Sequence, residues 1–240
     1  GLLDIFLTHF TDDHNTLYRN LGDGNFRDVS LLAEIAFPSW AFLGWGTGFI
    51  DFDNDGWEDL FVSNGHLFPQ VDNYQLGRSF HQRSQLFKNL GNGKFQEFMG
   101  GLDKVKLWSS RGAAFADFDN DGDIDIAVNN LDGNPWLLMN EGGNQQGWLS
   151  LFLEGVRSNR SGIGARVIAS TSTGKQIREV RGGSSYQSSH DFRVHFGVGN
   201  TNEIKNLEVR WPDGSTQKFN QVSANVHYRL KEGGKLQKLD

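Results

Sequence analysis

DFDNDG stands at residues 51–56 and returns, letter for letter, at residues 117–122. The longer phrases around the two copies, FIDFDNDGWEDLFVSNG (49–65) and FADFDNDGDIDIAVNN (115–130), also align. GLLDIFLTHF at residues 1–10 matches the same phrase from its glycine onward. The first part of the chain is therefore built from an irregular repeat whose most regular feature is a run of alternate aspartates.

A second phrase follows each acidic one. It reads LYRNLGDGNFRDVS at 17–30, LFKNLGNGKFQEFMG at 86–100 and, in a weaker form, LLMNEGGN at 137–144. Glycine supplies positive φ in tight turns, so each phrase predicts a β-hairpin. Units of roughly 40 to 65 residues with about four short strands are typical of β-propeller blades. The sequence thus predicts an all-β fold that starts with a partial propeller, about two to three blades of a larger ring.

The acidic loops have the spacing of a site for a hard cation. Such a cation takes six to eight oxygen ligands, and a glycine at position 6 (Gly56, Gly122) folds the loop back on itself. Without a cation, carboxylates this close would repel one another by roughly a kcal/mol or more per pair. The predicted ligands are the side chains at positions 1, 3, 5 and 9 and the carbonyl at position 7: Asp51, Asp53, Asp55, Trp57 and Asp59, then Asp117, Asp119, Asp121, Asp123 and Asp125.

Other loop types fit less well. An EF-hand requires Glu at position 12, where this chain has Val62 and Val128. The high oxygen count favours Ca²⁺ over Mg²⁺, and the lack of His and Cys in the loops disfavours Zn²⁺. The remaining alternative is an acidic Asx-type turn that binds nothing. In the opening GLLD, Gly1 matches position 6 and Asp4 matches position 9, so this copy predicts half of a site.

Composition predicts a globular chain of two domains. Its 240 residues are 37% hydrophobic, cysteine is absent, and no apolar run approaches the roughly 18 to 20 residues of a membrane span. Residues 1–146 hold 9 Lys and Arg against 21 Asp and Glu, whereas residues 147–240 hold 14 against 8. This asymmetry predicts a boundary in the Gly/Asn-rich run at 140–147. We interpret the weakly basic second part as a solvated surface rather than a nucleic-acid site.

The second part predicts a compact antiparallel β-sandwich of about eight short strands. Apolar and polar residues alternate along 192–196, 207–211 and 226–230, so each run can bury one face. Ser188, His190 and Asp191 lie close in sequence, but neighbours along a strand point to opposite faces and do not form a triad by adjacency. We therefore predict no catalytic residues, and an ordinary hydrogen-bonded role for His195.

The segment 64–85 is long for a connection between strands and mixes polar with aromatic residues. Long ordered loops on a rigid scaffold often carry recognition, so a carbohydrate or protein ligand is one hypothesis. The other is a loop that covers the rim and uses the same groups to fix itself. The candidate ligand-binding residues are His66, Gln70, Asp72, Tyr74, Arg78 and His81.

The motifs resemble two known families. The DFDNDG loops and LYRNLGDGNF hairpins are similar to the FG-GAP/VCBS repeats of integrin-α-like propellers. GIGARVIAST (162–171), HFGVG (195–199) and LEVRWPDGSTQKF (207–219) resemble the ASPIC and UnbV domain of many bacterial secreted proteins. The resemblance implies an extracellular, periplasmic or cell-surface calcium-binding propeller, residues 1–146, with a sandwich-like domain, residues 147–240. The truncated first loop and the missing loop after residue 140 depart from the pattern.

Two function classes remain open. The first is a non-enzymatic adhesion or recognition module with structural calcium and a protein or carbohydrate partner. The alternative is an accessory or catalytic part of an enzyme that processes polysaccharides or secondary metabolites. Metal-assisted catalysis needs a base beside an open coordination position, and the four side-chain positions of each loop look filled, which favours the first class. Binding of nucleic acid lacks the required aromatic and basic pattern.

Overall fold

The computed structural model describes residues 2–74, 77–171 and 174–239. Strands dominate, and the helical elements are short: α1 (Ala36–Ser39) and the 3-10 helices η1 (Pro69–Asn73), η2 (Leu102–Lys104) and η3 (Gly143–Gln145). The prediction of an all-β fold is confirmed. In these described ranges, no helix has the length and the apolar content needed to cross a membrane.

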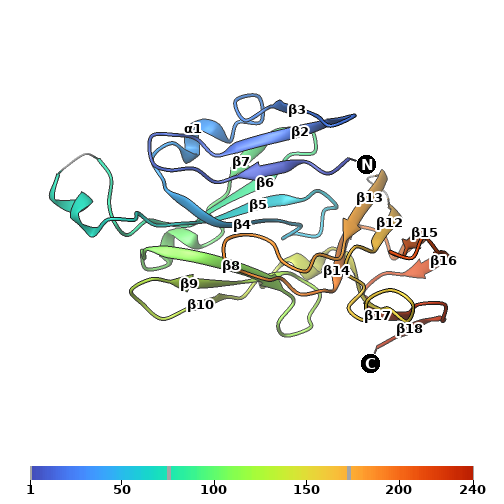
Figure 1. The fold of residues 1–240 in the computed structure, drawn as a ribbon. Helices are drawn as coiled ribbons and strands as arrows, with labels where there is room; N and C mark the ends of the chain where they lie inside the picture. Colours follow the sequence, from blue (N-terminus) through green and yellow to red (C-terminus); the bar gives the residue numbers. More distant parts are fainter. Residues whose placement is uncertain (1, 75–76, 172–173, 240) are drawn as a thin grey trace.

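The strands from β1 to β10 form three consecutive sheets (Figure 1). The first has β1 (Ile5–Leu7), β2 (Thr16–Gly22) and β3 (Asn25–Asp28); the second has β4 (Gly44–Ile50), β5 (Asp59–Asn64), β6 (Gln85–Asn89) and β7 (Phe95–Glu97); the third has β8 (Ser110–Ala116), β9 (Asp125–Asn130) and β10 (Trp136–Leu138). Neighbouring strands within each sheet are antiparallel. That these three sheets are blades of a larger propeller stays a prediction.

The three sheets stack face to face because β5 is apolar on both faces. Side chains alternate along a strand, so Leu60 and Val62 pack toward the first sheet and Phe61 packs toward the third. All three are fully buried. The inner strands β4 and β8 approach closely, since a Cβ on Gly46 would lie 2.4 Å from Ala113 N.

The first sheet has an open edge. β5 lies between β4 and β6, and β9 lies between β8 and β10, but β1 pairs with β2 alone among the described residues. Ile5 and Leu7 are also 42% and 44% exposed, because no sheet of the described residues covers the face that the first sheet covers on their equivalents in β5, Leu60 and Val62.

The second half contains two further sheets around one core (Figure 1). In their strand orders these are β14 (Val194–Gly199), β11 (Gly147–Glu154), β17 (Val226–Lys231) and β18 (Leu236–Lys238), and β13 (Gly174–Glu179), β12 (Arg166–Thr171), β15 (Glu203–Arg210) and β16 (Thr216–Ser223). The prediction of about eight strands is confirmed within the described residues.

One pairing corrects the expectation of an antiparallel sandwich. β11 pairs with β17 in parallel, from Leu149 opposite Val226 to Glu154 opposite Lys231. Parallel neighbours need a long crossover, and here the whole sheet of β12, β13, β15 and β16 lies between them in sequence. Hydrophobic alternation identifies the buried face of a strand and not its direction, so the sequence did not reveal this pairing.

Candidate metal centre

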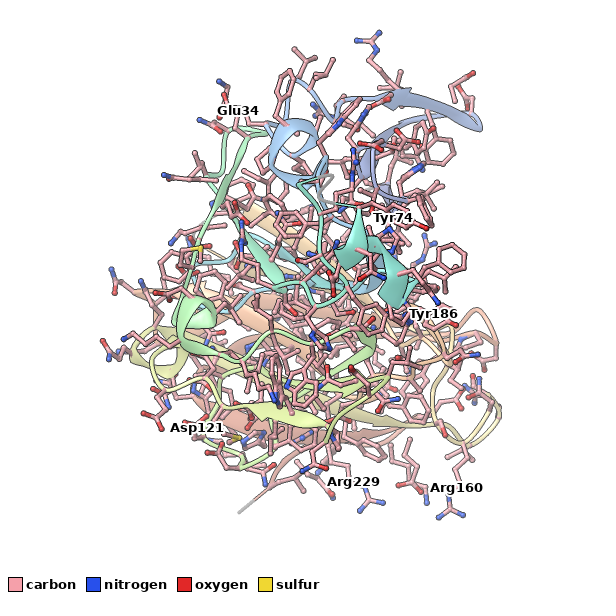
Figure 2. All side chains as sticks on the ribbon, turned by 90° about the vertical axis from the view of Figure 1, so that its left-hand side faces the viewer. Glu34, Tyr74, Asp121, Arg160, Tyr186 and Arg229 are labelled. Carbon is pink, nitrogen blue, oxygen red and sulfur yellow. The ribbon has the colours of Figure 1, made fainter. Side chains whose placement is uncertain are left out.

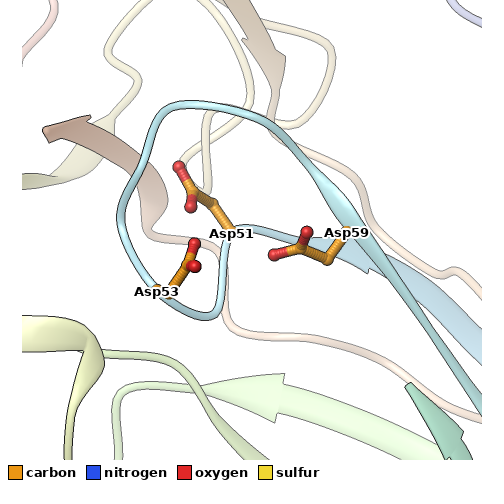
Figure 3. A group of neighbouring side chains, drawn as sticks. All are labelled: Asp51, Asp53 and Asp59. Carbon is orange, nitrogen blue, oxygen red and sulfur yellow. The ribbon is translucent and has the colours of Figure 1, made fainter. Parts of the chain in front are cut away.

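Both acidic loops gather three carboxylates. Ligand atoms of Asp51, Asp53 and Asp59 all lie within 4.8 Å of one another, and Figure 3 shows these side chains turned toward one another inside the loop. Asp117, Asp119 and Asp125 form an equivalent group in the second loop. Positions 1, 3 and 9 of the predicted spacing therefore converge in both copies.

The backbone of the loop accounts for this convergence. Asn54 and Asn120 at position 4 have φ of 56° and 61°, and Gly56 and Gly122 at position 6 have φ of 95° and 100°. These left-handed residues turn the chain back, so that the N–H of each glycine donates to the aspartate at position 1, at 2.9 Å for Asp51 and 3.1 Å for Asp117.

The aspartate at position 9 links each loop to the hairpin phrase that follows it. Asp59 Oδ1 accepts a hydrogen bond from Asn89 N at 2.7 Å, and Asp125 Oδ1 accepts one from Asn140 N at 2.8 Å. Asp4 Oδ1 does the same with Asn20 N at 2.8 Å. Asp4 thus holds the position that the sequence assigns to it, while Gly1 lies outside the described residues. The contact explains why the two phrases repeat together.

The carboxylates of the first loop are held in surroundings that disfavour charge. Burial raises the pKa of Asp51 to about 7 and that of Asp59 to about 8, and the charges of neighbouring aspartates add to both shifts. Asp51 is 3% exposed and Asp59 is fully buried. In the second loop, burial likewise raises the pKa of Asp117 and Asp125.

Two oxygens of the first loop lack hydrogen-bond partners. Asp51 Oδ1 and Asp53 Oδ1 are buried, and neither has a partner among the residues that the structure describes. An orphaned buried carboxylate oxygen is costly unless a proton or a cation satisfies it. Convergent carboxylates with unused oxygens are suited to a hard divalent cation, so the residues fit the ion that the spacing predicts.

The structure does not place the two position 5 side chains in these groups, so their role as ligands stays a prediction. Asp55 and Asp121 lie outside the two converging groups. Asp55 Oδ1 accepts a hydrogen bond from Trp57 N at 2.9 Å. Asp121 Oδ2 accepts one from Asn144 Nδ2 at 2.6 Å. Both side chains are used within the loop or by its neighbour.

Lys88 is a member of the first site that the sequence reasoning missed. Its Nζ forms an ion pair with Asp53 and lies 3.6 Å from Asp55 Oδ2. The residue comes from LFKNL in the hairpin phrase, where the third repeat has Met139. The sequence signal that could have identified Lys88 is its place in β6 beside Asn89, because the Asn89 N–H contacts Asp59. The first acidic loop therefore has a positive charge beside it at a place where the second loop has an uncharged side chain.

The residues at position 7 have different surroundings. The Trp57 side chain is 40% exposed, whereas Asp123 is fully buried. Asp123 Oδ2 accepts a hydrogen bond from Gly143 N at 3.1 Å, and burial raises its pKa to about 7. The Asp123 side chain therefore braces the 143–144 turn. That the backbone carbonyls of Trp57 and Asp123 coordinate a cation stays a prediction.

Polar groups of the segment 64–85 are largely used to hold the segment itself. Arg78 pairs with Asp12 of the first sheet's loop, and His81 Nε2 lies 2.6 Å from Asp132 Oδ2 beyond β9. Asp72 Oδ1 accepts a hydrogen bond from Phe80 N at 2.8 Å. These contacts favour the self-fixing hypothesis for the three residues.

The other candidates of this segment lie apart. His66 is buried, and its Nδ1 accepts a hydrogen bond from Phe68 N at 3.1 Å. Gln70 is exposed, and Tyr74 is 67% exposed. Figure 2 shows Tyr74 well separated from Asp121 of the second acidic loop. The role of the six candidates in ligand binding stays a prediction.

The Ser, His and Asp neighbours in the second half do not assemble into a triad. Ser188 Oγ donates to Tyr186 O at 2.8 Å, and Asp191 pairs with Arg193. The His190 ring packs against Phe115 with centroids 4.6 Å apart, and neither of its nitrogens has a hydrogen-bond partner in the described part of the chain.

Repeated acidic loops with paired hairpins, followed by a two-sheet segment, are the features that resemble FG-GAP-like repeats and the ASPIC and UnbV family. Comparison with family sequence models agrees: residues 1–62 match the FG-GAP-like repeat, and residues 155–237 match the family described as ASPIC and UnbV. The resemblance inferred from the motifs is confirmed.

The chain is similar to proteins named cartilage acidic protein 1. It is 26% identical to the Homo sapiens protein over 267 residues, which cover 90% of this chain and 40% of that protein. Identity to the Mus musculus protein is 31% over 250 residues, with 83% and 38% covered. For the Xenopus tropicalis protein it is 30% over 170 residues, with 68% and 25% covered. The chain spans less than half the length of these curated relatives.

Proposed function

We propose that this chain is a non-enzymatic, calcium-binding adhesion or recognition module of an exported or cell-surface protein. The observation that carries the proposal is Asp51. It is 3% exposed, and its Oδ1 has no hydrogen-bond partner within the described residues, although Asp53 and Asp59 converge on the same point. A bound Ca²⁺ would satisfy this oxygen and remove the repulsion among the three carboxylates.

The calcium would be structural because the sites are enclosed. Asp51, Asp59, Asp117 and Asp125 are all buried. A substrate needs an open coordination position beside a base, and enclosure of this kind gives it little access. Extracellular calcium modules have Kd values on the order of 10⁻⁴ to 10⁻³ M, which supports a location outside the cytosol, where calcium at that concentration is available.

The proposed architecture is a propeller piece, residues 1–146, followed by a sandwich domain, residues 147–240. No sheet in the described residues mixes strands from the two parts. One apolar cluster fills the space between the last two sheets, whereas separate clusters join the first three sheets in series. The exposed Ile5 and Leu7 of β1, whose equivalents in β5 pack against a neighbouring sheet, support the interpretation that the first three sheets are blades of a larger ring.

A protein or carbohydrate partner would bind at the exposed part of the segment 64–85. Figure 1 shows this segment projecting at the end of the sheets opposite the second half. The contacts of Arg78 with Asp12 and of His81 with Asp132 fix its base, and the η1 region presents Gln70 and Tyr74 to solvent. An exposed aromatic side chain on a loop that is held by contacts at its base is suited to recognition. A glycan and protein array with and without calcium, comparing the chain with Tyr74→Ala, tests this assignment; equal signals from both forms on every ligand would contradict it.

A melting experiment tests the calcium proposal. The chain is dialysed against EDTA and then melted with EDTA or with millimolar Ca²⁺. We expect the melting temperature to rise with Ca²⁺ by several degrees, since a ligand that binds only the folded state stabilises it. The double variant Asp51→Asn/Asp117→Asn is the control and should lose the response. Equal melting temperatures of the parent chain in EDTA and in Ca²⁺ would refute the proposal.

A further inference from the structure

Asn54 joins the first acidic loop to three other segments of the chain. The residue is fully buried at position 4, between Asp53 and Asp55. Its Nδ2 donates to Gly122 O at 2.9 Å and to Gly143 O at 3.0 Å. Its Oδ1 lies 2.6 Å from His195 Nε2 in β14. Although Asn54 lies between two predicted cation ligands in the sequence, its side chain contacts other segments, one of which is β14 in the second half.

The backbone of Asn54 makes a further contact with the same strand. Its carbonyl oxygen accepts a hydrogen bond from Gly199 N at 2.9 Å. His195 and Gly199 are the first and last residues of HFGVG. Between them, a Cβ on Gly197 would lie 2.2 Å from Asp51 Oδ2 and 2.5 Å from the Asn54 backbone. Only glycine fits there, so HFGVG and DFDNDG are packed directly against each other.

The second acidic loop repeats the arrangement with different partners. Arg193 Nη1 donates to Asn120 Oδ1 at 2.7 Å, and its Nη2 donates to Asp117 O at 2.7 Å. His227 Nε2 lies 3.2 Å from Asn120 O. A Cβ on Gly122 would lie within 2.0 Å of the Trp148 indole, at 1.8 Å from its Cε2. The position 4 residue of each loop therefore contacts the second half of the chain.

We infer that cation binding in the acidic loops controls the docking of the second half, residues 147–240, onto the three sheets, with Asn54 and Asn120 as the positioning residues. This inference rests on the proposed calcium binding. Positions 3 and 5 flank position 4, so a cation that draws the carboxylates together also fixes the backbone at the asparagine. Without the cation, repulsion among the carboxylates opens the loop and moves the asparagine from its partners. Linkage is reciprocal, so docking also tightens cation binding.

Hydrogen exchange measured on the full chain tests the inference without any substitution. The Gly199 amide, bonded to Asn54 O, is the reporter. We expect its exchange to slow at least about tenfold when Ca²⁺ replaces EDTA, with less change in the β15 and β16 hairpin, which pairs with β12. Calorimetric titration of the same sample gives calcium binding independently.

Asn54→Ala separates docking from cation binding. The variant keeps every carboxylate of the loop, so it should still bind Ca²⁺, but more weakly, by about tenfold, and calcium should no longer protect Gly199. The matched control is Asn206→Ala, at an exposed position in β15, which should behave as the parent chain.

The outcomes distinguish the two proposals. If the parent chain binds no Ca²⁺ in the titration, the proposed function fails and the inference with it. Calcium binding that leaves Gly199 exchange unchanged overturns the inference alone. Unaltered calcium protection and affinity in Asn54→Ala would also overturn it, because docking would then not pass through this residue. If Asn54→Ala does not fold, the parent-chain exchange and Asn120→Ala, with His227 peptides as reporter, still decide the question.

Discussion

At the scale of single residues, Asp51 is a buried carboxylate whose two oxygens have different surroundings. One of its oxygens accepts a hydrogen bond from Gly56 N, and the other is buried with no partner in the described part of the chain. Burial raises its pKa to about 7, above roughly 3.9 for an unperturbed aspartate. Near neutral pH and without a cation, such a carboxyl group is only partly protonated, and we expect calcium binding to release the bound protons.

The first prediction concerns pH. Because the folded-state pKa values of Asp51 and Asp59 are raised, the folded chain binds protons that the unfolded chain has released. In EDTA, the stability that this protonation contributes is fully present below about pH 4 and is lost as the pH rises through 7 to 8. We expect the melting temperature to fall between pH 5 and 8 in EDTA. Millimolar Ca²⁺ should weaken or reverse the trend, and a fall of the same size in both buffers would contradict the assignment.

The second prediction concerns Lys88, whose ammonium occupies the neighbourhood that a cation would use. Lys88→Met introduces the residue found at the matching place in the third repeat and removes a competing positive charge. We expect Ca²⁺ to bind the first loop about tenfold more tightly, equivalent to roughly 1.4 kcal/mol. Lys94→Met, which breaks an exposed pair with Glu34, is the matched control for titration calorimetry. Unchanged or weaker binding in Lys88→Met would rule out the competition.

Among the elements, β5 is a strand that is buried along its whole length and on both faces. Its side chains enter two different apolar clusters, one toward the first sheet and one toward the third. Phe61 meets Phe115 of β8 edge to face, with centroids 5.9 Å apart. The strand begins at Asp59, so the packing of the sheets and the placement of the position 9 ligand depend on the same element.

The third prediction tests this packing. Phe61→Ala leaves a cavity between the second and third sheets and should destabilise the chain by about 3–5 kcal/mol. Phe118→Ala, at a position 47% exposed, should cost less than about 1 kcal/mol. Urea unfolding in saturating calcium gives both values. Similar midpoints for the two variants would mean that the sheets do not share this core.

The acidic elements could be predicted in part from spacing alone. The regular aspartates and the glycine at position 6 identify the loops, and hydrophobic alternation identifies the strands that follow. Spacing counts oxygens and does not say which carboxylates turn inward, so Asp55 and Asp121 were placed with the others. The contact of Lys88 depends on the pairing of β5 with β6. The outward turn of Asn54 depends on a strand about 140 residues further along the chain.

At the scale of the whole molecule, basic side chains of the second half contact the acidic loops of the first. The first half is acidic and the second is basic. From the sequence, we interpreted the basic second part as a solvated surface. In the structure, Arg178 Nε lies 3.3 Å from Glu58 Oε1 beside the first loop, and Arg193 donates to Asp117 O and Asn120 Oδ1 of the second loop. Part of the basic character therefore serves the interface. The sequence shows the asymmetry but not the docking that uses it.

The most direct test of the account is a count of bound calcium. The chain is stripped with EDTA, returned to buffer, and titrated with Ca²⁺ in a calorimeter. The two carboxylate groups predict two ions per chain, one lost in Asp51→Asn and both lost in Asp51→Asn/Asp117→Asn. A parent chain that binds no Ca²⁺ at millimolar concentration, or a double variant that binds as many ions as the parent, would contradict the central claim that these loops are cation sites.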